Sequence, residues 1–168
     1  VLILTVPDGS SHGKNTPAIF LQTSLASDSQ TPIHELFHVM HYGYTYYRAS
    51  WFLEGVARWA QRFQVGADYV TNCCGFATNM PLTFPLTSED HGYCDVAPFL
   101  DYLGRKYGSM AAGSDGSDVV QAILEELAAV GSEDDSGALR AMENALERLR
   151  PSRDSALGRA LVEWTGAN

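Results

Sequence analysis

Residues 31–43, TPIHELFHVMHYG, carry the pattern His-Glu-x-x-His at His34, Glu35 and His38. Side chains four residues apart lie one above the other on the same face of an α-helix, so these two imidazoles converge on one point. Glu35 lies about 100° further round the helix, beside that point rather than on it. The pattern therefore predicts a metal site between the two histidines, with Glu35 placed to take a proton from a water molecule held there.

The flanking residues favour a helix over this stretch. Thr31 suits the N-cap position and Pro32 the first helical position, where a missing N–H costs nothing. An apolar stripe beside the histidines predicts a largely buried helix; it consists of Ile33, Leu36, Phe37 and Met40. Buried histidines also occur as hydrogen-bonded core residues, so the metal interpretation depends on finding a third ligand.

A third ligand is needed because catalytic zinc usually has three protein ligands and an open fourth position for water. The metzincin pattern would supply a histidine at position 44, where this chain has Tyr44, so that branch is excluded. His41 lies two helical turns from His34, about 10 Å away, and we expect it near the cleft rather than on the same ion. Glu54, in the segment SWFLEGVARW (50–59), is the better candidate, because this segment predicts a second helix beside the first.

The two segments HELFH and WFLEGVARW together resemble the gluzincin branch of the zinc metallopeptidases, the thermolysin-like arrangement in which a glutamate on a second helix completes the site. The close match covers about residues 31–63, and the rest of the chain agrees only in the expected order of elements. The resemblance implies one Zn²⁺ per chain and Glu35 as the general base. The implied ligands are His34, His38 and Glu54.

Arg58 departs from the family pattern, because thermolysin carries an acidic residue one turn after the ligand glutamate, where it supports a ligand histidine. An ion pair of Arg58 with Glu54 or Glu35 would weaken the site or inactivate it. The position of the Arg58 side chain therefore bears directly on activity.

Two downstream residues are candidates for stabilising the oxyanion. Gluzincins commonly use a tyrosine or histidine for this role, and the resemblance makes Tyr93 the first candidate and His91 the second. Both stand just before an expected helix over residues 95–107. A packing role for the tyrosine and a loop position for the histidine are the alternatives.

Charge and composition narrow the classes of partner. The chain has 168 residues and a net charge of −9, which disfavours nucleic acid and anionic membranes because their phosphates would be repelled. No uncharged apolar run approaches the roughly 18–20 residues that span a bilayer. We expect a peptide or protein substrate; the sequence specifies no oligomeric state.

The three cysteines bear on the compartment. We expect one disulfide from Cys73 or Cys74 to Cys94, which would close a loop of about twenty residues and indicate an oxidising compartment. Three buried free thiols are the alternative. The chain opens on an apolar segment without a basic leader, which suggests a processed product or an excised part of a larger protein. We therefore expect a secreted or cell-surface location.

The order of elements predicts one α+β domain over residues 1–168, with a small N-terminal β-sheet packed on a mainly helical body and the zinc cleft between them. The strands are expected at residues 1–6 and 17–23. Residues 66–92 are expected to form an irregular rim of the cleft. Further helices are expected at residues 51–65, 95–107, 118–130, 136–149 and 152–164.

The function that follows is that of a zinc-dependent metalloendopeptidase. One alternative is a catalytically impaired zincin-fold binding module with a structural zinc site. A weaker alternative is a helical domain with a chance motif, in which Glu54 would lie far from both His34 and His38.

Overall fold

The structure is a computed structural model that describes residues 2–7, 15–20, 30–45, 49–66, 87, 92–109, 115–130 and 135–166. For residues 2–7, 15–20, 65 and 92–95 it describes the backbone alone. All statements below refer to these parts of the chain.

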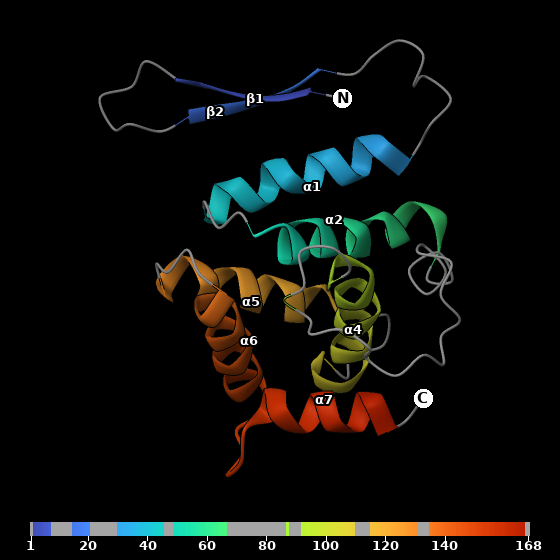
Figure 1. Cartoon of the computed structure of the whole chain (residues 1–168), viewed down its shortest axis with the longest axis vertical. Coiled ribbons are helices and arrows are strands. Elements are labelled where there is room, and N and C mark those ends of the chain that lie inside the picture. The colour runs from blue at the N-terminus through green and yellow to red at the C-terminus, as the bar shows by residue number, and fades with distance from the viewer. Residues whose placement is uncertain are drawn as a thin grey trace.

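Six helices form the described body of the protein (Figure 1). They are α1 (Gln30–Tyr44), α2 (Ser50–Val65), α4 (Gly92–Tyr107), α5 (Ser117–Val130), α6 (Asp135–Leu149) and α7 (Ala156–Gly166). Helix α2 packs against α1 on one side and α4 on the other, while α5 pairs with α6 and α7 packs on α6 and α4. The stack therefore runs from α1 at one end to α7 at the opposite end (Figure 1).

The predicted α+β class is wrong, because the body and its core are helical. Every buried apolar side chain that the structure describes belongs to one of α2, α4, α5, α6 and α7. The backbone of β1 (Leu2–Pro7) and β2 (Asn15–Phe20) pairs as an antiparallel hairpin, with Leu2 opposite Phe20. A two-stranded hairpin is not a core-forming sheet layer, since independent sheets need three or more strands or extensive packing. The fold is better described as a helical one.

Helix α1 also differs from its prediction. It begins at Gln30, so Thr31 lies inside it rather than at the N-cap. Leu36 and Met40, expected in the buried stripe, have exposed fractions of 52% and 51%. The buried face of α1 instead carries His38 and His41. The side of α1 that packs on α2 therefore carries the histidines together with Phe37, whose ring centroid lies 6.4 Å from that of Trp59.

Helix α2 is central because it is buried over most of its length. Four of its large apolar side chains have exposed fractions of 1% or less: Trp51, Phe52, Val56 and Trp59. Each such side chain contributes roughly 1.5–3 kcal/mol relative to exposure. The α2–α4 contact is closest at Gly55, where an added Cβ would lie 2.5 Å from the Cβ of Val96. A side chain at position 55 would therefore push the two helices apart.

Charged groups join the same helices. Asp101 of α4 is buried and pairs with Arg62 of α2, and its other oxygen accepts from Arg105 at 2.8 Å. The indole Nε1 of Trp51 donates to Asp135 of α6 at 2.6 Å. Because a buried carboxylate without partners is costly, these contacts fix how α2, α4 and α6 meet.

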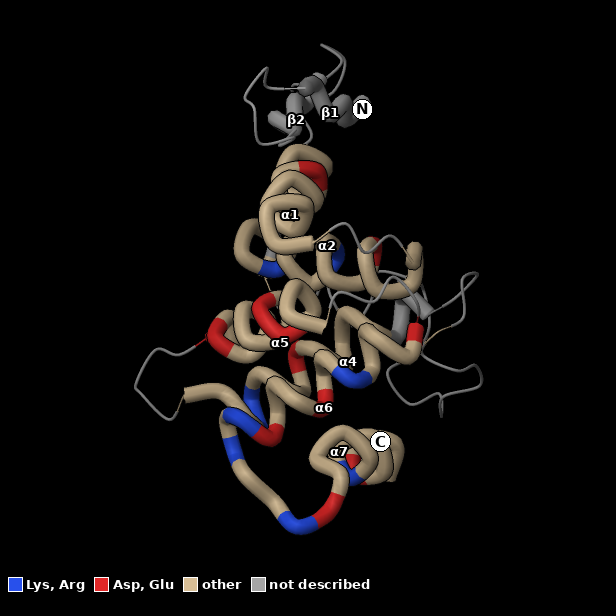
Figure 2. The backbone as a smooth tube through the Cα atoms, turned by 90° about the vertical axis from the view of Figure 1, so that its left-hand side faces the viewer, with Lys and Arg blue, Asp and Glu red and all other residues tan. Residues whose placement is uncertain are grey.

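Surface charges along the C-terminal half do not form a patch of one sign. Figure 2 shows the Lys and Arg residues of α6, α7 and their connection interleaved with Asp and Glu. Like and unlike charges therefore alternate over these described segments. None of the described helices is long and apolar enough to cross a membrane.

We expect Gly55→Ala to destabilise the protein, because its methyl group would overlap the Val96 side chain. The expected loss is about 1–3 kcal/mol in the free energy of unfolding, measured by urea denaturation. Gly43→Ala is the matched control, since no atom lies within 4 Å of a Cβ built there. That variant should be neutral or more stable by up to about 1 kcal/mol. Equal effects at both glycines would contradict the close α2–α4 contact.

Candidate metal centre

Three side chains from α1 and α2 come together where the two helices face each other. Nε2 of His34 lies 2.9 Å from Oε2 of Glu54, and Nε2 of His38 lies 3.4 Å from Oε1 of the same carboxylate. The two imidazole rings meet edge to face, with their centroids 4.7 Å apart. One ligand atom from each residue lies within 4.8 Å of the other two, so this group could hold a metal ion.

The helical spacing explains this convergence. His34 and His38 are one turn apart on α1, so both rings point from the same face toward α2. Glu54 lies on the α2 face toward α1, while its neighbour Gly55 faces α4 at the close contact with Val96. Consecutive residues of α2 therefore face two different neighbours, with Gly55 at the apolar contact with α4 and Glu54 at the histidines of α1.

The carboxylate of Glu54 is held in its charged form. Hydrogen bonds from His34 and then His38 hold the pKa of Glu54 well below its ordinary value, and they outweigh the opposing effect of burial. An ionised carboxylate is the form that binds a metal ion. The arrangement thus prepares the ligand without a large rearrangement.

The donor set fits zinc. Two imidazole nitrogens and one carboxylate oxygen are a ligand combination used by catalytic zinc sites, which leave the fourth position open. His38 has an exposed fraction of only 6%, and its Nδ1 has no hydrogen-bond partner among the described residues. Among the described residues, its ring is held by packing and by the contact of Nε2 with Glu54.

The metal centre opens into a pocket of about 370 Å³. It is lined by Thr31, His34, Glu35, Glu54, Arg58 and Gln61. Glu35 is partly exposed on the same wall as His34, as the sequence spacing predicts. The Glu35 carboxylate thus lies next to the cluster of His34, His38 and Glu54, in a pocket that solvent can enter.

Arg58 lines this pocket and donates from Nη1 to Oε1 of Gln61 at 3.2 Å. Gln61 has an exposed fraction of 3% and donates from Nε2 to the backbone oxygen of Gln30 at 3.1 Å. The Glu54 carboxylate, in turn, is engaged by the two histidines. The contact with Gln61 thus joins Arg58 to the wall of the pocket that holds Glu54.

Gln61 is a pocket residue that the sequence interpretation missed. It follows Glu54 by seven residues and Arg58 by three, so it lies on the same face of α2. That spacing is the signal that could have identified it. Through Gln30 it also ties the first turn of α1 to α2, which keeps the two walls of the pocket together.

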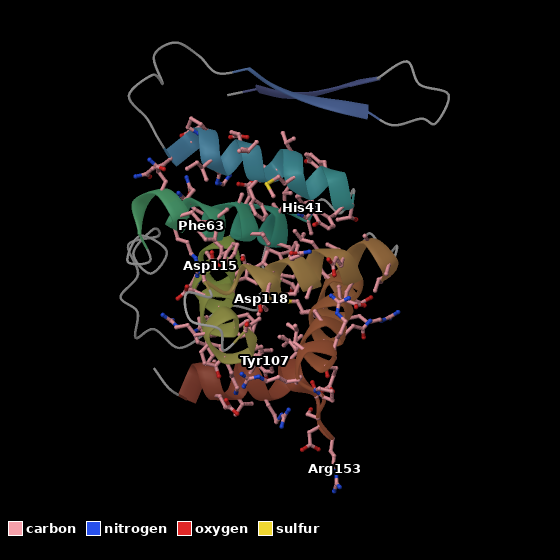
Figure 3. All side chains as sticks on the ribbon, turned by 180° about the vertical axis from the view of Figure 1, so that it is seen from behind. His41, Phe63, Tyr107, Asp115, Asp118 and Arg153 are labelled. Atoms are coloured by element: carbon pink, nitrogen blue, oxygen red, sulfur yellow. The ribbon has the colours of Figure 1, made fainter. Side chains whose placement is uncertain are left out.

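His41 does not belong to the cluster. It is completely buried, and its ring meets that of Phe52 at a centroid distance of 5.9 Å (Figure 3). The prediction that it would not share the ion with His34 agrees with its position. Its role is packing between α1 and α2 rather than lining the cleft.

The oxyanion candidates lie at or beyond the edge of the described structure. Helix α4 begins at Gly92, earlier than expected, so the backbone of Tyr93 lies in its first turn. Val96, one turn later, meets Gly55 next to Glu54. His91 lies outside the described residues, as do Cys73 and Cys74, so the predicted disulfide to Cys94 stays a prediction.

Comparisons of the chain with protein-family models, with curated proteins and with solved structures find no match.

We expect Glu54→Ala to weaken zinc binding by more than about 100-fold, because loss of a ligand should exceed the 10- to 100-fold loss seen for outer partners. Zinc affinity would be measured by competition with a chromogenic chelator. Glu125→Ala is the matched control, since Glu125 of α5 has the same side-chain exposure of 40% and carries the same charge. Unchanged zinc affinity in the Glu54 variant would exclude Glu54 as a ligand.

Proposed function

We propose that this protein is a zinc-dependent metalloendopeptidase of the thermolysin-like, gluzincin type. The observation that supports the proposal best is the convergence of His34, His38 and Glu54 at one side of a pocket whose wall also holds Glu35. Three ligands with an adjacent carboxylate base are the parts that hydrolysis by zinc requires.

Each part has a distinct task. Zinc bound by the two histidines and Glu54 would polarise the substrate carbonyl and lower the pKa of a nearby water molecule. Glu35 accepts the proton of that water as it attacks the peptide carbonyl. The same carboxyl group then donates the proton to the leaving amine nitrogen. Its position on α1, directly after His34, keeps it beside the reaction without occupying a ligand position.

The oxyanion role falls to Tyr93 or His91 in this proposal. The contact between Gly55 and Val96 brings the start of α4 against α2 at the residue next to Glu54. Tyr93 lies one helical turn before Val96, and it stays the first candidate because of the family resemblance. A peptide or protein substrate and a secreted or cell-surface location, with a disulfide from Cys94, complete the proposal.

Glu35→Gln should abolish peptide hydrolysis while zinc remains bound, because the change removes the base and leaves the three ligands. The expected loss in kcat is at least about 100-fold. Both quantities would be measured on the same preparation, hydrolysis with a fluorogenic casein and zinc by elemental analysis. Loss of zinc from this variant would show that Glu35 is a ligand rather than a base. A zinc-loaded unmodified chain without hydrolysis would instead indicate a binding module.

Tyr93→Phe should lower kcat by about 100- to 1,000-fold with little change in KM, because an oxyanion donor acts mainly in the transition state. His91→Asn is the parallel test of the second candidate. Tyr102→Phe is the control, since its hydroxyl donates to Glu163 of α7 and does not line the pocket. Full activity in both the Tyr93 and His91 variants would refute the assignment of the oxyanion to this segment.

A further inference from the structure

Arg58 places a positive charge in the wall of the metal pocket. It follows Glu54 by one helical turn on α2, and both side chains line the same pocket. The guanidinium is partly exposed, so a molecule that enters the pocket can reach it. A substrate in the pocket could therefore contact both the candidate metal ligands and the guanidinium of Arg58.

The orientation of Arg58 is built by buried polar contacts. Gln61 accepts from Nη1 of Arg58 and is itself anchored to the backbone oxygen of Gln30. Because Gln61 is 97% buried, its amide has one position, and the guanidinium bound to it is held toward the pocket. A guanidinium carries its N–H donors in a planar fork, a geometry that matches the two oxygens of a carboxylate.

A divalent ion would change the sign of the charge in the pocket. The lining that the structure describes has the carboxylates of Glu35 and Glu54 and the guanidinium of Arg58, and a divalent ion held there would raise the sum of these charges from −1 to +1. The chain as a whole has a net charge of −9, so its general surface repels anions. With an ion bound, the pocket would be a local exception within an acidic protein.

We propose that Arg58 is a specificity residue that binds a carboxylate of the peptide substrate. This inference rests on the proposed peptidase function and adds the class of substrate: peptides with a carboxylate at a fixed distance from the cleaved bond. The carboxylate is either an Asp or Glu side chain or the C-terminal carboxylate. Bidentate binding by Arg58 would orient the peptide across Glu35 and the metal ligands.

The test uses the zinc-reconstituted full chain and a mixed pool of N-acetylated peptides, with cleavage products identified by mass spectrometry. We expect the cleaved peptides to share a carboxylate at one position relative to the cleaved bond. Selected substrates are then resynthesised in two forms. Replacing Asp or Glu by Asn or Gln tests the side chain, and C-terminal amidation tests the terminal carboxylate. Only one of these changes should lower kcat/KM.

Variants test whether Arg58 causes the preference for a substrate carboxylate. Arg58→Gln should lower kcat/KM for the carboxylate substrate by about 10- to 100-fold and leave its neutral counterpart nearly unchanged, as loss of a charged hydrogen bond predicts. Arg58→Lys should retain part of the preference. Arg153→Gln is the control, because Arg153 is exposed at the opposite end of the molecule and makes the same change in charge (Figure 3). Cleavage without a carboxylate preference, or a preference unchanged in Arg58→Gln, would overturn the inference.

A second measurement keeps this inference separate from the peptidase proposal. Arginine Nε–H signals of the ¹⁵N-labelled, metal-free chain are followed by NMR during titration with acetate and, as a neutral control, acetamide. The signal missing in Arg58→Gln identifies Arg58, and we expect it to shift with acetate at lower concentrations than the Arg153 signal. Absence of hydrolysis would end the peptidase proposal alone. Absence of a selective Arg58 shift both in the metal-free chain and after zinc is added would end the carboxylate site.

Discussion

The close packing of α2 against α4 at Gly55 is the constraint on which the rest of the structure depends. The absence of a side chain at this residue allows α4 to approach α2, and Val96 fills the space. The adjacent residue, Glu54, lies about 100° further round α2, on its side toward α1, and reaches the histidines of α1. One face of α2 thus belongs to the apolar core and the other to a polar site, and two consecutive residues separate them.

The α1–α2 interface contains polar contacts beside apolar ones such as Phe37 with Trp59. Its contacts include Glu54 with His34 and His38, and Gln61 with the backbone of Gln30. Placing a carboxylate here costs desolvation energy, and the hydrogen bonds that keep the Glu54 pKa low offset that cost. An ion bound by these groups between the two helices would stabilise the folded state further, because binding to the folded state adds to its stability.

Several features were predictable from sequence because they depend on local spacing. The four-residue interval between His34 and His38 implies a shared helix face, and five of the six described helices lie close to their expected ranges. The fold class was wrong because a short apolar segment near the N-terminus says nothing about whether it joins a larger sheet. The exposure of Leu36 and Met40 could not be predicted from sequence either. A helix with two candidate faces buries the face that its neighbours cover, and the sequence of the helix does not specify those neighbours.

The sequence by itself determined the ligand types, their order and the helices that carry them. Only the tertiary structure decided that Glu54 contacts both histidines, that Arg58 bonds to Gln61, and that His34, Glu54, Arg58 and Gln61 line one pocket. The reason is physical: positions along one helix follow from its 3.6-residue period, whereas the distance between two helices depends on every side chain packed between them. The contact of His34 with Glu54, which are twenty residues apart, could therefore be identified only in the packed structure.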